Sequence, residues 1–292
     1  MPSLRDIRKR IASVKNTRQI TKAMKMVAAA KLRRAQEAIV RARPYAEGLE
    51  RVLGSLATRA DLASHPLLVV RPVKRVELVV LTSDRGLCGG FNSNVLRRAQ
   101  RFAAEARGAD GHAYERVELS TLGRKGRDFA ARRKLDVRKD YVGIFEHLEF
   151  SRAEAIGAEL AQHYVEADLD AVFLLYNEFQ SAISQRVSLV QLLPIAPRPV
   201  VEGMDHPADY LYEPTRAEVL DALLPQHLSM QLWRAMLESQ ASEHGARMTA
   251  MDAATKNASE MIARLTLQFN RARQAYITKE LMEIVSGAEA LK

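Results

Sequence analysis

The chain has 292 residues, of which 47% are hydrophobic and 27% are charged, with 44 Lys and Arg against 35 Asp and Glu. This composition excludes a disordered chain, and the single cysteine excludes an internal disulfide or a cysteine-based zinc site. No run of about 18 apolar residues predicts a membrane-spanning helix, and no apolar segment predicts a secretory signal, so we expect a protein of a reducing compartment.

The net charge of +9 is concentrated at one end of the chain. Residues 1–43 contain thirteen basic and two acidic side chains, a balance of +11, whereas residues 44–292 sum to −2. The sequence therefore combines a strongly basic N-terminal arm with a nearly neutral body.

The basic arm has the composition of a helix. Residues 4–42 contain neither Gly nor Pro and are rich in good helix formers, with Ser3 as the expected N-cap and Asp6 in the first turn. Pro44 predicts a kink or a stop, with a second helical stretch over 45–60.

A 4-3 spacing of positions along this arm predicts one face of a coiled coil. The positions are Ile7, Ile11, Val14, Arg18, Thr21, Lys25, Ala28, Leu32, Ala35, Ile39 and Ala42. Because the middle of this set is polar, we expect the apolar stripe to shift its register there to Ile20, Met24 and Val27.

The middle of the chain alternates strands with helices. Strands are predicted at 76–82, 116–122, 135–142, 170–176 and 186–193. Helices are predicted at 95–106, 126–134 and 152–167. This order indicates a Rossmann-like α/β domain with helices on the faces of a small open sheet. Residues 194–214 contain five prolines and predict an irregular connection.

The C-terminal part is again helical, over 215–286, with Thr215 as its predicted cap and Gly287 just past its end. Pro225 predicts a bend. Six positions of this helix repeat the 4-3 spacing: Ala258, Ile262, Leu265, Phe269, Ala272 and Tyr276.

The expected fold class is therefore α/β with a long antiparallel coiled coil of the N- and C-terminal helices. The expected domains are an N-terminal helix over 1–60, a central α/β domain over 61–213 and a C-terminal helix over 214–292.

The glycine-rich turn 84–90 after the first strand is the candidate for enzyme chemistry, because α/β proteins bind phosphates at such turns. Its glycines fit neither the P-loop nor the dinucleotide-binding pattern, so a tight turn with positive φ is the favoured interpretation. Cys88 is interpreted as a partly buried thiol. The seven histidines show no metal-binding spacing, and we predict no catalytic residue, metal or cofactor.

The basic arm has three interpretations: a solvated helix face, a nucleic-acid-binding surface, or a surface for an acidic protein partner. The arm has no aromatic residue before Tyr45 on which bases stack, although binding to a duplex by charge alone stays open.

Three segments together resemble the gamma subunit of F-type ATP synthase. They are IRKRIASVKNTRQITKAMKMVAAAKLRRAQ from Ile7, the central LTSDRGLCGGFN, and the C-terminal stretch from RMTAMDAATKNASE to EIVSGA. Their order and spacing span nearly the whole chain.

The resemblance implies a non-catalytic rotor shaft that couples proton flow to ATP synthesis or hydrolysis and regulates ATPase activity. It implies the alpha and beta subunits of a catalytic ring, the epsilon subunit and the c-ring as partners, and a place on the cytoplasmic face of a bacterial inner membrane. A basic coiled-coil nucleic-acid-binding protein and a small α/β enzyme are the alternatives.

The resemblance also implies residues that contact partners. Those facing the alpha and beta ring would be Met24, Lys25, Arg85, Cys88, Arg247, Arg273, Gln274, Thr278 and Glu280, with Arg247 acting through a carboxylate such as Glu280. Tyr210 and Tyr212 would lie near the epsilon subunit and the c-ring. Since Cys88 is alone, the regulatory cysteine pair of the plant chloroplast form is not expected here.

Overall fold

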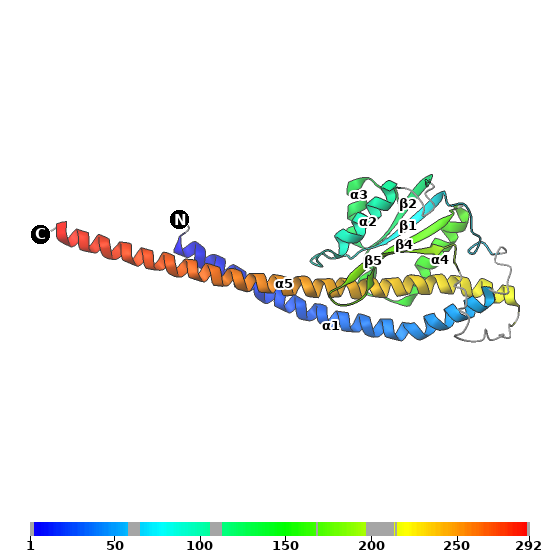
Figure 1. Ribbon diagram of the computed structural model, residues 1–292, viewed down its shortest axis with the longest axis horizontal. Helices are drawn as coiled ribbons and strands as arrows, with labels where there is room; N and C mark the ends of the chain where they lie inside the picture. The colour runs from blue at the N-terminus through cyan, green and yellow to red at the C-terminus, as the bar shows by residue number, and fades with distance from the viewer. Residues whose placement is uncertain are drawn as a thin grey trace. The chain divides into compact units, whose positions relative to one another are not determined.

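A computed structural model describes residues 3–57, 65–105, 113–167, 169–196, 213 and 215–290, with side chains up to residue 286. The chain divides into two compact units, one formed by 1–28 with 247–292 and the other by 29–246. The long helices α1 (Leu4–Ala57) and α5 (Arg216–Ala290) each contribute to both units (Figure 1).

Helix α1 begins with a reciprocal cap. The Ser3 hydroxyl donates to Asp6 Oδ2 at 2.7 Å and accepts from the Asp6 backbone N–H at 3.2 Å, as the sequence predicts. Pro44 does not end the helix. The stretch beyond it stays helical because Leu49, Leu53 and Leu56 are buried in the core of the α/β unit.

Helix α5 begins after Thr215, whose hydroxyl accepts a hydrogen bond of 3.3 Å from the Glu218 backbone N–H. Pro225 lies inside the helix, and so does Gly287, because the helix runs to Ala290. The end predicted at Gly287 is therefore wrong.

In the first unit, α1 and α5 pack side by side and antiparallel. Three pairs fix the register: the Arg8 guanidinium lies over the Phe269 ring at 5.5 Å, the Thr21 and Thr255 hydroxyls are 2.8 Å apart, and Lys25 Nζ is 2.6 Å from Asp252 Oδ1. Residue numbers fall in α5 as they rise in α1. Extended to the start of α1, this register places Leu4 opposite Arg273.

In the second unit, five strands form one sheet. They are β1 (Arg75–Leu81), β2 (Arg116–Leu122), β3 (Val137–Tyr141), β4 (Ala171–Phe179) and β5 (Gln185–Leu193). The spatial order is β3-β2-β1-β4-β5, with β5 antiparallel to β4 and the other pairs parallel. All five predicted strands are present, with ends within three residues of those predicted.

Helices lie in the connections from β1 to β4, whereas a short turn over residues 180–184 joins β4 to β5. The helices are α2 (Phe91–Glu105), α3 (Arg124–Arg133), the short 3-10 helix η2 (Ile144–Glu146) and α4 (Phe150–Glu166). The predicted helices are confirmed. Helix α2 begins four residues earlier than predicted, at Phe91, whose side chain is buried.

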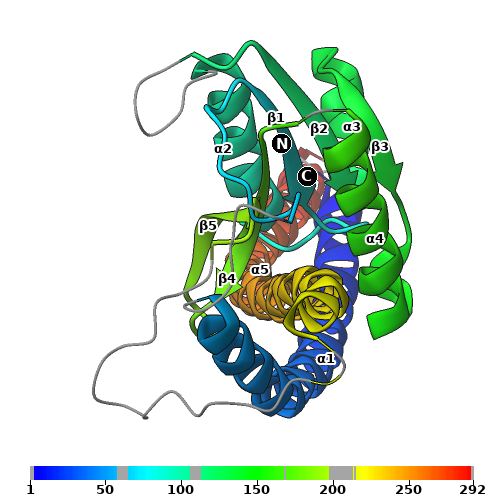
Figure 2. The ribbon, with the colours of Figure 1, turned by 90° about the vertical axis from the view of Figure 1, so that its right-hand side faces the viewer.

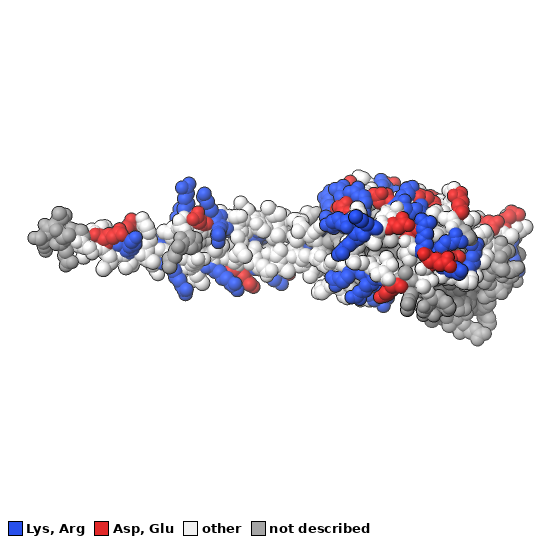
Figure 3. Space-filling view, turned by 90° about the horizontal axis from the view of Figure 1, so that it is seen from above, with Lys and Arg blue, Asp and Glu red and all other residues white. Residues whose placement is uncertain are grey.

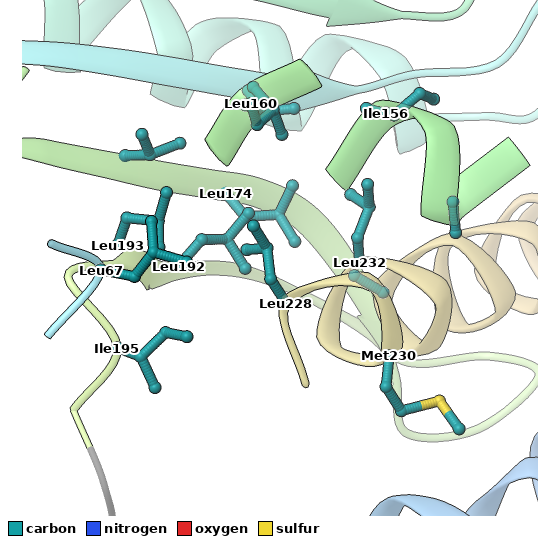
Figure 4. Packing of buried hydrophobic residues seen from close by; sticks show 14 of the residues in the cluster. Leu67, Ile156, Leu160, Leu174, Leu192, Leu193, Ile195, Leu228, Met230 and Leu232 are labelled. Atoms are coloured by element: carbon teal, nitrogen blue, oxygen red, sulfur yellow. The ribbon is translucent and has the colours of Figure 1, made fainter. Parts of the chain in front are cut away.

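The sheet carries a separate apolar cluster on each face. Val76, Leu78 and Val80 of β1 pack with α2, whereas the alternate residues Val79 and Leu81 pack with α1, α4 and α5. This alternation follows from the two-residue period of a strand. Figure 4 shows the second cluster, where leucines of β4 and β5 meet α4 and α5.

The first half of α5 is a core helix of the α/β unit. Between His227 and Ala246 almost every residue is buried, including Leu228, Leu232 and the run 241–246. Part of α1 lies beside it in the same unit (Figures 1 and 2). Both terminal helices thus belong in part to the α/β unit, whose boundaries at 29 and 246 differ from the ends of the helices.

Candidate functional site

The described residues contain no cluster of His, Cys, Asp or Glu suited to a metal ion. In the same part of the chain, no helix combines the length and the apolar character that crossing a bilayer requires. A cavity of about 90 Å³ lies between α1 and α5, lined by charged groups such as Arg43, Glu50 and Glu238. Ligand pockets are typically several times larger, at roughly 300–1,000 Å³.

The ligand site usual for this fold lies between β1 and β4. The chain leaves β1 toward β2 and returns on the other side at β4, so the strand order reverses at this point. In open α/β sheets, ligands bind in the crevice at the carboxyl ends of the two strands that flank such a reversal.

The chain's own helix α5 occupies this crevice. Ala246 packs against Cys88 and Phe91 of the turn after β1, and the Ser242 hydroxyl donates to the Asn177 carbonyl of β4 at 3.0 Å. A Cβ on Gly245 would lie 3.0 Å from the Ala182 carbonyl oxygen, so the backbones already touch. Residues 242–246 thus occupy the place where a ligand would meet these two strand ends.

The turn after β1 is held by its own hydrogen bonds. The Ser83 backbone N–H donates to Asn92 Oδ1 at 2.9 Å, and Asp84 Oδ1 accepts from the Arg124 backbone N–H at 2.9 Å. Positive φ occurs at Gly89, as expected for a tight turn, and also at Leu87, whose φ is 63°. Gly86 and Gly90 do not take positive φ.

Cys88 does not reach the surface of the turn. Its side chain is 2% exposed, and Asn92 Nδ2 lies 3.2 Å from its sulfur. A partner that meets this turn therefore meets Arg85 and Leu87, of which Leu87 is 64% exposed. Arg85 pairs with Glu146 of η2 at 3.5 Å.

The helix pair of the first unit has polar residues in its seam. Thr21 is buried and Lys25 is half-buried, whereas Ile20 and Val27 are 60% and 57% exposed. The predicted shift of register to Ile20, Met24 and Val27 is therefore wrong, although Met24 itself is partly buried. The polar residues keep their seam positions because each finds a polar partner on α5.

Lys25 is engaged within the chain. Hydrogen bonds from Lys25 at 2.6 Å and from Lys256 at 3.0 Å hold the pKa of Asp252 below its ordinary value of 3.8. Asp252 thus bridges the two helices and stays ionised at neutral pH. A partner that uses Lys25 meets an ammonium group already paired.

The end of α5 extends past the start of α1. Since the register reaches Arg273 at Leu4, the α5 residues beyond Gln274 have no opposite residue among the described part of α1. Arg273, Gln274, Thr278 and Glu280 are all exposed there. Arg247 and Glu280 stand 33 positions apart on this helix, about 50 Å at 1.5 Å per residue, so they form no direct pair.

This free end also exposes large apolar side chains, of which the sequence analysis singled out only Tyr276. They are Tyr276, Ile277, Leu281, Met282, Ile284 and Val285, each 47–69% exposed. The sequence pattern that could have revealed them is the 4-3 spacing of Ile277, Leu281 and Ile284. Such a spacing predicts an apolar helix face that packs against another surface.

Tyr210 and Tyr212 lie outside the described residues. The structure thus brings Arg273, Gln274, Thr278 and Glu280 onto one free helix end and Lys25 into the polar seam. Arg85 lies on the separate turn after β1.

A buried ionic cluster joins three strands to α4. Glu77 of β1 is fully buried and accepts hydrogen bonds from Ser120 of β2 and, at 2.9 Å, from Arg138 of β3. Arg138 also donates to Glu159 of α4 at 3.0 Å. On the same face, His163 of α4 lies 3.1 Å from Glu118.

The charges in this cluster stabilise one another. Burial opposes the charge on Arg138, but Glu77 and Glu159 outweigh it and raise the pKa of Arg138 above its ordinary value. Burial likewise raises the pKa of Glu159, but hydrogen bonds from Lys139 and Arg138 bring it below 4.5. The cluster fastens α4 to the sheet.

A family profile and full-length relatives assign the chain to the same family. The family profile described as ATP synthase matches residues 3–291. An ATP synthase gamma chain of Anaeromyxobacter sp. (strain Fw109-5) is 61% identical over the whole of both chains, and one of Geotalea daltonii is 52% identical over the whole of both chains.

Solved structures agree with the fold. A chain of the central stalk and c-ring of Tetrahymena thermophila mitochondrial ATP synthase matches with a TM-score of 0.61 and 27% identity, over 80% of this chain and 99% of that one. A chain of Euglena gracilis mitochondrial ATP synthase shows the same fold, with a TM-score of 0.67 and 20% identity over 99% and 94% of the two chains. The nucleic-acid alternative finds no support among these relatives. By its match to the family profile and to full-length relatives, this chain belongs to the ATP synthase gamma chain family.

Proposed function

We propose that this chain is the central rotor subunit of an F-type ATP synthase. In this role it couples proton flow through the membrane sector to ATP synthesis or hydrolysis in a ring of alpha and beta subunits, and it regulates ATPase activity. The observation that carries the proposal is the free end of α5, an exposed helix with an apolar face and a polar patch, in a chain of this family.

The rotor role is non-catalytic. The crevice where an α/β domain usually binds nucleotide holds residues 242–246 of α5, so the chain offers ATP no such site of its own. Its contribution is mechanical. An asymmetric shaft favours a different nucleotide-binding state of the ring in each orientation, which is a difference in affinity between states.

The proposed partners follow from the exposed surfaces. The apolar face from Ile277 to Val285 suits the inner wall of the ring, and Arg273, Gln274, Thr278 and Glu280 offer polar contacts beside it. Met24, Arg85 and Arg247 are proposed to contact the same ring. Tyr210 and Tyr212 are proposed to contact the epsilon subunit and the c-ring, which would place the chain peripherally on the cytoplasmic face of a bacterial inner membrane.

Exposed polar contacts suit a part that turns. A solvent-exposed ion pair contributes about 0–1 kcal/mol, so such contacts break and re-form at little cost. The relative from Tetrahymena thermophila is a central-stalk component, and the same position is proposed for this chain.

The test is the double variant Arg273→Ala with Gln274→Ala in the reconstituted complex. We expect loss of coupled ATP synthesis with the complex still assembled, because both side chains are exposed and contribute nothing to the pairing of α1 and α5. The matched control is Arg264→Ala with Gln268→Ala. These two residues are also an Arg and a Gln exposed on α5, in the stretch where α5 runs alongside α1. Unchanged synthesis in the first variant would refute the assigned contact.

A further inference from the structure

The face formed by α2 and α3 is strongly basic although the body of the chain is nearly neutral. We define the α2–α3 face by its nine basic residues: Arg97, Arg98, Arg101, Arg124, Lys125, Arg127, Arg132, Arg133 and Lys134. The two helices and Lys134 contain two acidic residues, Glu105 and Asp128. Figure 3 shows Lys and Arg gathered over these helices.

Within the described residues, the chain neutralises little of this charge. Arg127 pairs with its neighbour Asp128 at 3.0 Å, and Arg98 lies 3.9 Å from Glu105. Arg132 donates to a backbone carbonyl at 3.0 Å, and Arg133 lies over the Phe129 ring. Seven of the nine basic groups have no carboxylate within ion-pair distance there.

The placement of these residues is unfavourable for the isolated chain. Arg124, Lys125 and Arg127 stand in the first turn of α3, where the helix dipole favours negative charge. No acidic residue of α3 itself stands in this turn, and the Asp84 carboxylate, 2.9 Å from the Arg124 backbone nitrogen, faces all three basic side chains. Arg97 and Arg101 are like charges four residues apart on α2, which also destabilises a helix. A negative surface docked against this face would relieve both effects.

The surface chemistry selects among anionic partners. The large apolar side chains exposed in the described structure include none from α2 or α3. Phe129 of α3 is partly buried and lies under the Arg133 guanidinium, so the described part of the face offers no open aromatic platform for nucleic-acid bases and no apolar anchor for a membrane interior. Seven of the nine basic groups are arginines, whose planar guanidinium matches a carboxylate through two parallel hydrogen bonds.

The face is also continuous with the turn after β1. The Arg124 backbone N–H at the start of α3 donates to Asp84 at 2.9 Å, next to the exposed Arg85. Arg85 is already proposed to face the ring, so protein is the expected neighbour of α3 as well.

We propose that the α2–α3 face docks a carboxylate-rich protein surface on another subunit of the same complex. This inference rests on the proposed rotor function. It adds a contact surface formed by the α/β unit itself, separate from the polar seam of the first unit and from the free end of α5.

The test is zero-length carbodiimide coupling in the purified, assembled complex, because this reagent joins a lysine amine to a carboxylate only where the two touch. Lys125 and Lys134 are native reporters, and Arg97→Lys and Arg101→Lys add two more without changing the charge. Lys74 lies 3.0 Å from Glu115 in the same unit and supplies an intrachain positive control.

We expect mass spectrometry to find links from these lysines to Asp or Glu of another subunit, reduced at least fivefold in 0.5 M salt because screening weakens exposed pairs. The triple variant Arg97→Gln, Arg101→Gln, Arg132→Gln should reduce the links from Lys125 and Lys134 by a similar factor. Its isolated chain should unfold at an unchanged or higher temperature, since the three side chains are exposed.

Three results would overturn the proposal. An assembled, active complex that gives the Lys74–Glu115 link but no intersubunit link from this face refutes the docking surface and leaves the rotor function intact. Binding of the isolated chain to vesicles with 30% phosphatidylglycerol or to duplex DNA, abolished by the triple variant and without intersubunit links, assigns the face to lipid or nucleic acid. Failure of the chain to assemble with alpha and beta subunits refutes the rotor function and this inference together.

Discussion

At the scale of single residues, glycines mark where helices touch. Gly157 of α4 faces Ser229 of α5, and a Cβ on Gly157 would lie 2.9 Å from the Ser229 hydroxyl oxygen and 3.3 Å from its Cα. A side chain there would force α4 away from α5. The close approach of the two helices therefore depends on the absence of one methyl group.

We predict that Gly157→Ala lowers the free energy of unfolding by about 1–3 kcal/mol, the usual effect of overpacking a tight contact. The matched control is Gly48→Ala in α1, where a new Cβ meets nothing within 4 Å. That change should stabilise by about 0.5–1 kcal/mol, because alanine favours helix over glycine. Urea titration of both variants measures the difference, and a neutral Gly157→Ala would contradict the close contact.

The buried pair of Glu77 and Arg138 gives a second prediction. Glu77→Ala leaves Arg138, which is 16% exposed, without one of its two carboxylates, and we expect a loss of about 3 kcal/mol. Arg138→Met should cost a similar amount by leaving the fully buried Glu77 without the guanidinium that now pairs with it. Because each single change strands the other charge, the double variant should cost less than the sum of the two, and additive losses would contradict the coupling.

At the scale of elements, α4 is held to the sheet by ionic contacts as well as by packing. Glu159 accepts hydrogen bonds from Arg138 at 3.0 Å and from Lys139 at 2.7 Å, both on β3. The apolar residues Ile156 and Leu160 beside it on the helix are buried in the core.

The lowered pKa of Glu159 sets the pH dependence of this attachment. A carboxyl group whose pKa is below 4.5 in the folded chain stabilises the fold above that pH, and the stabilisation disappears as the pH falls through the folded value. We therefore predict that Glu159→Gln is less stable than the parent at pH 7 and that the gap closes as the pH falls below 4.5 and through the lowered pKa of Glu159. Urea titrations across this range measure the gap, and a gap that does not change with pH would refute the ionic contribution.

The secondary structure could be predicted element by element, because hydrophobic periodicity and caps are local signals. The strand Arg116–Leu122 and the cap at Ser3 match the predictions. How those elements pack against one another was harder to predict from the sequence. Nothing local tells that most of α5 between His227 and Ala246 is buried, since its cover comes from α1, α4 and the sheet.

In the candidate site, too, local features could be predicted from the sequence, whereas contacts between distant residues could not. The polar seam was misread because Thr21 and Lys25 interrupt an apolar stripe, and only their partners Thr255 and Asp252, more than 220 residues away, explain why they stay inside. The inward position of Cys88 likewise depends on Ala246 of a distant helix. Contacts between distant segments decide both cases.

At the scale of the whole molecule, the chain carries apolar surface that its own fold does not cover. The side chains from Ile277 to Val285 are exposed and lie beyond the start of α1. They contribute nothing to the stability of the chain by itself. They do add an aggregation-prone patch to a protein separated from its complex.

We predict that deleting residues 277–292 leaves the unfolding temperature of the isolated chain unchanged within about 2 °C, because the side chains described in this segment, 277–286, are all exposed. The shortened chain should also remain soluble to a higher concentration. Calorimetry and light scattering test these two expectations. A marked drop in unfolding temperature would show that the free end packs on the rest of the chain.

The helix segment 242–246 permanently occupies the crevice in which other α/β proteins bind a ligand. It belongs to the continuous helix α5, so it leaves the crevice only if the helix itself moves. A dissolved phosphate compound would have to displace the buried helix residues 242–246 to bind there. In the α/β unit this crevice therefore holds a helix in place and does not bind a ligand reversibly. Nucleotide titrations of the isolated chain should show no saturable binding at this crevice up to millimolar levels.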